Sequence, residues 1–519
     1  MNAKLARYFA RPGRPQPLPL PLERLVIERC RSGNLQFKEA LSLFECLLSS
    51  QHLRPSIRPF NSLLSVIPKT NHPDRHITVI SLFNRLNRIR NRGVYPDFLT
   101  FGILIDCCCS VRRVDLGFCM LGQSLQAGCG VDTVMFNSLI KGLCAAKKIP
   151  DAAKLLAKMP LMGCAPSLFT YNTLIGCLCS NGNSRLGLEL CHQMAKEGSC
   201  CKPDVVTYNT LIHGFCREGD AAVASRMFDG MISKGVVPDI FTYNILINSL
   251  CRQGDMHSAQ KMVDEMVVKG VLPDVYTYNS LILGSLGVGD THEAFRLYEE
   301  LLGCGLQADV FTYTNLIHGC CQEGAFLRAS DFLQEMITKE VMPNVATYNC
   351  LIHGLCAVGE WKRAIRVLGV MVNQGISPDV VTFNVLINSL CNNRITCEAE
   401  KLVSLMEERG VKPNVITYNA LLHGYVLEDR LDDTINLYER MAQKGIEPNQ
   451  YSYNTLINGY CKSGRISEAL HLLEKMQRQG LKPNEVTIDI ILDAFSNCEK
   501  PDEVQCIISK MEAFRKRVV

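Results

Sequence analysis

The feature that most constrains this chain is a segment that returns every 35 residues. The segments read VVTYNTLIHGFC from Val205, IFTYNILINSLC from Ile240, VYTYNSLILGSL from Val275, VFTYTNLIHGCC from Val310 and VATYNCLIHGLC from Val345. A fixed period of this length is typical of repeat architectures, in which each unit buries its apolar side only against its neighbours. We therefore expect an array of stacked units in place of a single compact core.

Twelve such repeats follow one another from residue 57 to residue 484. They begin at Ile57, Phe98, Thr133, Leu168, Val205, Ile240, Val275, Val310, Val345, Val380, Val415 and Gln450. The repeat from Ile57 carries an insertion around residues 71–75, and the repeat from Leu168 gains two residues near 199–201. We expect a degenerate N-terminal repeat over 22–56 and a C-terminal capping repeat over 485–519.

Each repeat predicts a pair of helices. In the repeat from Val205, the apolar residues Tyr208, Leu211, Ile212 and Phe215 recur at helical spacing. A second apolar stripe follows and ends at a glycine such as Gly235, with a proline three residues later. Glycine supplies a left-handed cap and proline prevents continuation of the helix. The expected fold is all-α, a right-handed superhelical solenoid of helix hairpins of about 35 residues.

The 26 cysteines do not indicate disulfides or a metal centre. Disulfide scaffolds are short secreted chains, and these cysteines lack the paired spacing and histidine partners of a zinc site. Many of them occupy one repeat position, which Leu286 and Val426 also occupy, so the position is a small buried apolar one. The cysteines at this position are Cys109, Cys144, Cys179, Cys216, Cys251, Cys321, Cys356, Cys391 and Cys461. We expect no cofactor and no metal.

The N-terminal stretch, residues 1–21, predicts an organellar targeting presequence. It lacks acidic residues and carries Lys4, Arg7, Arg11 and Arg14. We expect it to be disordered and to direct the chain to the mitochondrion, with the chloroplast as the alternative destination. The alternative to a targeting role is a proline-rich tail without one. No apolar run approaches the roughly 20 residues of a membrane span, so we expect no membrane insertion.

The fifth residue of each repeat forms a polar row on the first helix. It is asparagine in ten units, namely Asn61, Asn137, Asn172, Asn209, Asn244, Asn279, Asn349, Asn384, Asn419 and Asn454. Elsewhere it is Thr314, Gly102 or Asp489. Asparagine costs a helix roughly half a kcal/mol relative to alanine, so its recurrence inside a helix indicates a compensating role. Four residues later lie His213, Asn248, His318, His353, Asn388, His423 and Asn458, on the same face.

The last residue of each repeat has two possible roles. These residues are Asp97, Asp132, Ser167, Asp204, Asp239, Asp274, Asp309, Asn344, Asp379, Asn414, Asn449 and Asn484. Aspartate, asparagine and serine are the preferred helix N-caps, and each stands directly before the next first helix. Helix capping alone explains why these residue types recur at the last position. A capping residue can also take part in binding.

The 35-residue period, the VTYNTLI helix and the KGVVPD ending resemble the plant pentatricopeptide repeat family. The uniform units resemble its P class, and the leader and cysteine-rich repeats resemble fertility-restorer-like mitochondrial members. The resemblance implies that the fifth and last residues of a repeat together select one RNA base, while the second residue flanks that base. The second-position residues are Val206, Phe241, Tyr276, Phe311, Val381, Ile416 and Tyr451, with Ala346 the smallest. Packing between repeats is the alternative role for these side chains.

The same resemblance assigns an RNA base to each pair of fifth and last residues. Asparagine with aspartate implies U, at Asn61 with Asp97, Asn172 with Asp204, Asn209 with Asp239, Asn244 with Asp274, Asn279 with Asp309 and Asn349 with Asp379. Asn137 with Ser167 implies C, and Thr314 with Asn344 implies A. Asn384 with Asn414, Asn419 with Asn449 and Asn454 with Asn484 imply pyrimidines. Gly102 with Asp132 selects none, so the expected site is 5′-U-N-C-U-U-U-U-A-U-Y-Y-Y-3′.

The resulting hypothesis is a sequence-specific single-stranded RNA-binding protein that acts on organellar transcripts by occupancy, through stabilisation, processing, translation control or silencing. We expect no enzymatic activity, because the chain has neither the HxE and CxxC motifs of a zinc deaminase nor a P-loop. The alternatives are a protein-binding scaffold of tetratricopeptide type and an adaptor that recruits a nuclease to RNA. The net charge of +4 permits nucleic-acid binding but is too small for a nonspecific binder.

Overall fold

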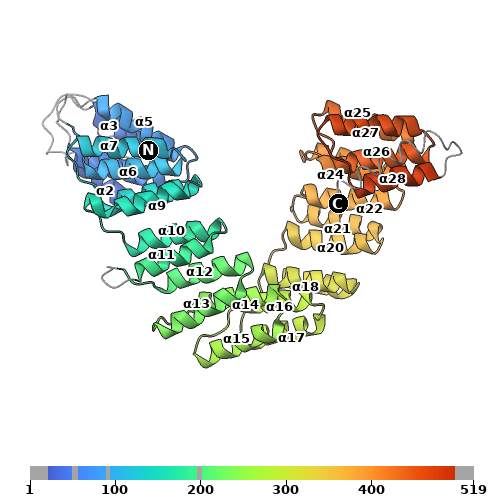
Figure 1. Cartoon of the computed structure of the whole chain (residues 1–519), viewed down its shortest axis with the longest axis horizontal. Helices are drawn as coiled ribbons and strands as arrows, with labels where there is room; N and C mark the ends of the chain where they lie inside the picture. Colours follow the sequence, from blue (N-terminus) through green and yellow to red (C-terminus); the bar gives the residue numbers. More distant parts are fainter. Residues whose placement is uncertain (1–21, 50–55, 89–93, 196–200, 497–519) are drawn as a thin grey trace, which may run out of the picture. The chain divides into compact units, whose positions relative to one another are not determined.

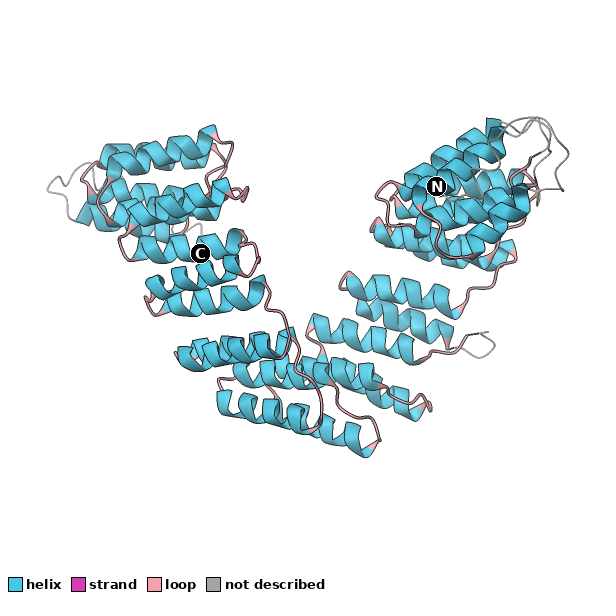
Figure 2. Cartoon of the chain, turned by 180° about the vertical axis from the view of Figure 1, so that it is seen from behind, coloured by secondary structure: helices cyan, strands magenta, loops and turns pink. Residues whose placement is uncertain are grey.

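The computed structural model describes residues 22–49, 56–88, 94–195 and 201–496. In these ranges all regular structure is helical, without strands (Figure 2). The expected presequence, the end of the C-terminal repeat beyond residue 496 and most of the insertion near residue 200 lie outside the described residues. None of the helices in the described ranges is long and apolar enough to cross a membrane.

Each of the twelve repeats contains a first helix, called helix A here. These helices are α4 (Ile57–Val66), α6 (Phe98–Ser110), α8 (Thr133–Ala145), α10 (Leu168–Ser180), α12 (Val205–Glu218), α14 (Ile240–Arg252), α16 (Val275–Gly287), α18 (Val310–Gln322), α20 (Val345–Ala357), α22 (Val380–Asn392), α24 (Val415–Leu427) and α26 (Gln450–Lys462). Each begins at the first residue of its repeat as placed from the sequence. The predicted repeat boundaries therefore coincide with helix starts.

Each repeat also contains a second helix, called helix B. These helices are α5 (Arg75–Arg88), α7 (Val114–Gln126), α9 (Ile149–Lys158), α11 (Ser184–Met194), α13 (Ala221–Ser233), α15 (Met256–Val268), α17 (Thr291–Gly303), α19 (Phe326–Thr338), α21 (Trp361–Asn373), α23 (Thr396–Glu408), α25 (Leu431–Gln443) and α27 (Ile466–Arg478). Two short 3-10 helices, η2 (Ile67–Lys69) and η4 (Pro160–Met162), complete the hairpins. The insertion expected in the first repeat separates η2 from α5.

Before and after the repeats, the described residues continue the same pattern. A helix pair, α2 (Leu22–Arg31) and α3 (Phe37–Ser49), occupies the degenerate N-terminal unit, and α28 (Glu485–Ser496) follows the last repeat. Helix α2 packs against α4, and α28 packs against α26, as a helix A would. The chain is an all-α solenoid of helix hairpins (Figure 1).

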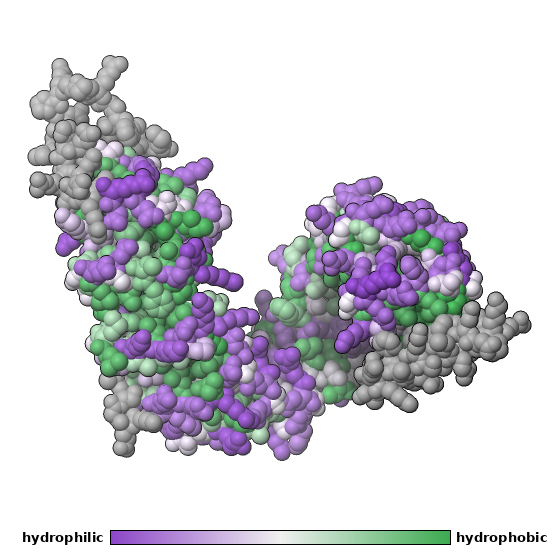
Figure 3. All heavy atoms as spheres, turned by 45° about the horizontal axis from the view of Figure 1, so that its top comes forward, coloured by the Kyte–Doolittle hydropathy of each residue, from purple (hydrophilic) through white to green (hydrophobic). Residues whose placement is uncertain are grey.

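By its internal contacts the chain divides into two compact units. The first comprises Met1–Ser249 with Val268–Val271, and the second comprises Leu250–Val267 with Leu272–Val519. Within each unit a helix A packs against its own helix B and against the helix A of the next repeat. Figure 3 shows hydrophobic surface gathered in patches between bands of polar side chains.

The buried stripe uses similar positions from repeat to repeat, as the repeat from Val345 illustrates. Tyr348, Leu351, Ile352 and Leu355 of α20 are buried. They meet a stripe from α21 that includes Met371. The same repeat positions recur at the next helices, so the core is continuous along each unit, as expected when hairpins stack.

Successive helices A approach closely at one glycine. A Cβ atom added to Gly354 would lie 2.5 Å from the Cβ and 2.8 Å from the Sγ of Cys321 in the preceding repeat. The same contact joins Gly284 to Cys251, and Gly424 to Cys391. The recurrent cysteine is therefore a small residue against which the next helix packs, and burial raises the pKa of the Cys251 and Cys391 thiols to about 12. No group of His, Cys, Asp and Glu suited to a metal ion occurs in the described ranges.

Candidate RNA-binding face

Each helix A is capped by the last residue of the preceding repeat. The Asp379 carboxylate accepts the backbone N–H of Thr382 at 2.9 Å, and the Thr382 hydroxyl accepts the backbone N–H of Asp379 at 3.2 Å. The predicted capping role is confirmed at each helix A from α6 to α26 and at α28, whether the residue is aspartate, asparagine or serine. Capping contributes about 1 kcal/mol per helix.

The fifth-position asparagine is bonded into that cap from the neighbouring helix. Asn349 donates from Nδ2 to the Asp379 Oδ1 at 3.2 Å, and its Oδ1 accepts the Thr382 hydroxyl at 2.6 Å. We call this group of fifth residue, last residue and next third residue the inter-repeat clamp. It links two successive helices A through side chains alone.

The same clamp recurs in both units. The donor amides and acceptor oxygens are those of Asn61 with Asp97, Asn172 with Asp204, Asn209 with Asp239, Asn279 with Asp309, Asn349 with Asp379, Asn384 with Asn414, Asn419 with Asn449 and Asn454 with Asn484, at 2.8–3.3 Å. Asn244 and Asp274 belong to different units, and only their separate positions are described. The structure thus brings together most of the residue pairs expected from the sequence.

The third residue of each repeat is a site residue that the sequence analysis missed. It is methionine in the repeat from Thr133 and proline in the repeat from Ile57. In the other repeats and in the unit from Glu485 it is a buried hydroxyl residue, namely Thr100, Thr170, Thr207, Thr242, Thr277, Thr312, Thr347, Thr382, Thr417, Ser452 or Thr487. This hydroxyl donates to the fifth-position asparagine of the preceding repeat at 2.6–2.7 Å in nine places, which are the eight clamps and the pair of Thr170 with Asn137. The signal was present, because a hydroxyl residue stands two places before nearly every fifth residue.

Three repeats depart from this arrangement. Gly102 has no side chain, and a Cβ there would lie 3.9 Å from the Met135 Cε at the next third position. The Thr314 hydroxyl meets the Thr347 hydroxyl at 2.9 Å. Asn137 accepts the Thr170 hydroxyl at 2.6 Å, but no bond joins its Nδ2 to Ser167 in the described part of the chain. These are the repeats for which the sequence assigned no base, A and C.

Hydrogen bonds in the clamp also keep several carboxylates ionised. Partial burial acts to raise the pKa of Asp97, Asp204, Asp239 and Asp379, but the bonds from threonine and asparagine outweigh it. Each pKa therefore lies below the ordinary value for aspartate. These four last-position residues are acceptors throughout the neutral range.

The clamp leaves specific groups unused. An asparagine amide has two N–H donors, and the clamp takes one of them. A last-position aspartate contributes one carboxylate oxygen to the bonds above, so its second oxygen stays an acceptor, whereas a last-position asparagine retains its own amide donors. Each clamp therefore presents a fixed donor beside a group that differs between aspartate and asparagine.

The second-position side chains are apolar groups that are largely exposed. Val206, Phe241, Tyr276, Phe311, Val381, Ile416 and Tyr451 keep between 52% and 71% of their surface accessible. Ala346 is exposed as well. Exposed apolar side chains at one repeat position are typical of a binding surface.

These positions line a groove in the second unit. It has a volume of about 720 Å³ and lies over α20, α22, α24 and α26. Fifth-position Asn384 and Asn419 lie in its wall with second-position Val381, Ile416 and Tyr451. The clamps and the exposed apolar residues therefore share one surface.

The ninth-position residues extend the polar row on the same helix face. His353 and Asn388 contribute to the groove. Burial lowers the pKa of His213, His318 and His423, with a further contribution from a cationic or imidazole neighbour in each case. These three imidazoles are therefore neutral at neutral pH and act as hydrogen-bonding groups rather than as cations.

Comparison with known proteins places this arrangement in a family. The model of the PPR repeat family matches residues 131–180, 203–252, 238–287, 278–322, 308–357, 343–392, 378–426, 413–459 and 451–497. A second model, PPR repeat, matches residues 169–199. Together the matches extend over most of the chain.

Curated relatives match shorter stretches. Protein Rf1, mitochondrial, of Oryza sativa subsp. indica is 35% identical over 104 residues, which are 20% of this chain and 12% of the rice protein. A putative mitochondrial pentatricopeptide repeat-containing protein of Arabidopsis thaliana is 39% identical over 93 residues, which are 18% of this chain and 17% of that protein. The matched stretch spans less than a fifth of either relative.

A solved structure shares the fold over nearly the whole chain. The pentatricopeptide repeat protein PPR10 of maize, in complex with an 18-nucleotide psaJ RNA element, aligns with a TM-score of 0.53 at 22% identity. The alignment covers 96% of this chain and 84% of that chain. With the repeat models matched along most of its length, the chain belongs to the pentatricopeptide repeat family.

Proposed function

We propose that this protein binds single-stranded RNA in a sequence-specific manner, with one base facing each repeat. The observation that carries the proposal is the recurrent clamp, which holds an asparagine amide in one orientation beside an exposed apolar side chain. A base needs such a pair of features, a surface for its ring and a directed polar group for its edge. Membership of a repeat family with an RNA-bound relative supports the same function.

The unused groups of the clamp suit pyrimidines. Uracil presents an N3–H donor next to carbonyl acceptors, whereas cytosine presents an N3 acceptor next to an amino donor. The free oxygen of a last-position aspartate such as Asp379 can accept from uracil N3–H, while the asparagine amide donates to a carbonyl. A last-position asparagine such as Asn414 offers donors, which suit cytosine N3. The clamp chemistry thus agrees with the expected bases.

We propose the site 5′-U-N-C-U-U-U-U-A-U-Y-Y-Y-3′, read from the repeat at Ile57 to the repeat at Gln450. The second base is unselected because Gly102 offers no polar group. The base-flanking role belongs to the exposed second-position residues, and Ala346 provides the smallest surface. The insertion in the first repeat lies after α4, and the clamp of Asn61 with Asp97 that is proposed to read the first U is formed.

The proposed cellular role rests on the relatives and on the sequence. Mitochondrial relatives and the arginine-rich leader over 1–21 support a mitochondrial site of action. The uniform repeats support the P class and action on organellar transcripts, including fertility restoration as in restorer-like members. We propose that the protein acts by occupying its RNA rather than by catalysis. We assign the presequence to 1–21, a degenerate repeat to 22–56, the RNA-binding repeats to 57–484 and a capping repeat to 485–519.

The test is binding of the purified full chain to a labelled RNA carrying the proposed site, at fixed near-physiological salt. A scrambled RNA and the same site as DNA serve as competitors. We expect a preference of at least about tenfold for the proposed RNA, since a good two-point base contact is worth about 1–3 kcal/mol. Equal binding to all three would refute base reading and favour a protein-binding scaffold.

A matched exchange tests a single repeat. Asp379→Asn preserves the cap, because Asn414 caps α24 in the same way, but it replaces an acceptor with a donor. We expect the variant to prefer C over U at the ninth base by about tenfold. The control is Glu360→Gln, which alters charge in the same repeat outside the clamp. An unchanged preference in Asp379→Asn would contradict the role of the last residue.

A further inference from the structure

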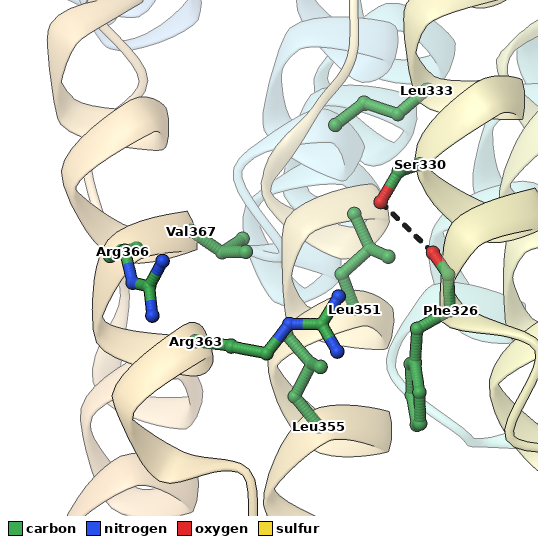
Figure 4. Close-up of a pocket in the computed structure, with 8 residues that line it drawn as sticks. All are labelled: Phe326, Ser330, Leu333, Leu351, Leu355, Arg363, Arg366 and Val367. Atoms are coloured by element: carbon green, nitrogen blue, oxygen red, sulfur yellow. Dashed lines mark hydrogen bonds between the residues drawn. The ribbon is translucent and has the colours of Figure 1, made fainter.

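The second unit contains an apolar hollow that includes none of the inter-repeat clamp residues. It lies between the helices B of two successive repeats, α19 and α21, over α20 (Figure 4). Its walls are formed by Phe326, Leu333, Leu351, Leu355 and Val367, and its volume is about 190 Å³. The Ser330 hydroxyl at its edge donates to the Phe326 carbonyl at 2.9 Å, so the hydroxyl does not require another partner.

The neighbouring gap shows how the chain fills such a space. Between α17 and α19, the rings of Phe295 and Phe332 stack with centroids 5.7 Å apart and an interplanar angle of 14°. The guanidinium carbon of Arg328 lies 3.5 Å from the Phe295 centroid. That gap is occupied by two rings from the chain and covered by one arginine.

The hollow lacks both rings. Ser330 stands at the repeat position of Phe295, and Val367 stands at the position of Phe332. At the position of Val367 the other helices B from α7 to α27 carry the larger residues leucine, methionine or phenylalanine, namely Met120, Leu155, Leu190, Met227, Met262, Leu297, Phe332, Leu402, Leu437 and Leu472. The combination of a serine and a valine at these positions explains why the space between α19 and α21 stays open.

The arginines at the hollow have no ion-pair partner among the described residues. Arg363 stands at the repeat position of Arg328, and Figure 4 shows its guanidinium reaching from α21 over Leu351 and Leu355. Arg366 lies one helical turn further along α21. None of the ion pairs or side-chain hydrogen bonds found within the described ranges involves either guanidinium. By contrast, Arg296 and Arg430 each pair with carboxylates.

We propose that the hollow binds an aromatic side chain from a protein partner, presented in a segment with carboxylates on either side of it. A cavity of about 150 Å³ suffices for benzene, so 190 Å³ accommodates a phenyl ring. Arginine stacks on aromatic faces, as Arg328 does in the adjacent gap. The two unpaired guanidiniums at the rim complement acidic flanking residues.

An RNA base fits the hollow less well. Its floor is aliphatic and offers no polar group to read a base edge, and the combination of serine and valine that opens it does not recur in the other helices B from α7 to α27. It also lies away from the clamps. Leu351 follows Asn349 by two residues, which is about 200° around a helix. A peptide in the hollow and RNA on the clamp face can therefore bind at the same time.

The experiment uses the purified full chain and a fluorescein-labelled acidic peptide, Asp-Glu-Phe-Glu-Asp, followed by fluorescence polarisation. We expect saturable binding that weakens at least about tenfold when alanine replaces phenylalanine, or when lysines replace the acidic residues. The double variant Ser330→Phe and Val367→Phe copies the filled gap and should lose binding to the same extent. Equal binding of the phenylalanine and alanine peptides would overturn the proposal.

Further variants separate the hollow from other surfaces. Arg363→Glu with Arg366→Glu should abolish peptide binding, whereas Arg226→Glu, an exposed arginine at the position of Arg366 in α13, should leave it unchanged. If the double phenylalanine variant does not fold, Val367→Leu takes its place. This smaller change introduces the residue found in several other repeats and should weaken peptide binding. Each variant is also tested on the proposed RNA, so failure of RNA binding and failure of peptide binding remain distinct. Displacement of the peptide by RNA, or loss of RNA binding alone in the arginine variant, would refute the proposal.

Discussion

The clamp predicts a stability change that does not depend on RNA. In Asn349→Ala, the chain loses one bond to the Asp379 carboxylate and one from the Thr382 hydroxyl. A neutral hydrogen bond is worth about 1 kcal/mol, and the bond to a charged group at this half-buried position about 1.5 kcal/mol. Alanine recovers about half a kcal/mol of helix propensity. The net expectation is a local destabilisation of about 2 kcal/mol.

A local method is needed, because a long repeat array does not unfold in a single two-state step. Hydrogen exchange followed by mass spectrometry, without RNA, should show about 30-fold faster exchange in peptides from α20 and the start of α22. Val381→Ala is the control, since Val381 is exposed, takes no part in the clamp bonds, and its change to a better helix former should not speed exchange there. Unchanged exchange in Asn349→Ala would refute the structural role of the clamp, whatever happens to RNA binding.

Three further stability predictions concern the backbone, the helix contacts and pH. Glu340 has a φ of 59° at the end of α19, where other repeats have glycine, so Glu340→Gly should raise stability by about 1 kcal/mol in thermal denaturation, and a lower Tm would contradict this. Gly354→Ala should destabilise the chain by about 1–3 kcal/mol, because its Cβ would overlap Cys321, while Gly369→Ala, where a Cβ meets nothing within 4 Å, should stabilise it. The aspartates with a lowered pKa, such as Asp204 and Asp379, stabilise the fold at pH values above about 4, and this contribution is lost as the pH falls further. An acid titration of Asp379→Asn monitored by circular dichroism should therefore show a weaker dependence on pH below 4 than the parent chain, and parallel curves would contradict the assignment.

Much of the architecture was predictable because it depends on local patterns. The apolar spacing from Tyr208 to Phe215 predicted a helix that the structure places at α12, and the glycine and proline positions predicted where each helix B ends. The N-caps followed from residue type alone. These features each involve residues within about two helical turns of each other, so a single sequence contains the full signal.

Features that depend on contacts between two repeats were harder to predict from the sequence. The Asn349 side chain bonds to residues 30 and 33 positions away, and the sequence showed each recurrence without the contact between them. The role of Thr382 was missed for this reason. The hollow presents the same difficulty, because Ser330 and Val367 are individually ordinary residues and become informative only when α19 and α21 lie side by side.

The repeat with Gly102 separates two explanations for the recurrent asparagine. Asp132 still caps α8 there, accepting the Met135 backbone N–H at 2.8 Å, although Gly102 has no side chain and Met135, the third residue of the next repeat, has no hydroxyl. Capping therefore does not require the asparagine. What the asparagine adds in the other repeats is a bond across two helices A that fixes its amide before any ligand arrives. A side chain already held in its binding orientation loses less conformational entropy on binding, so the same bonds that join the repeats would also prepare the face for the proposed RNA ligand.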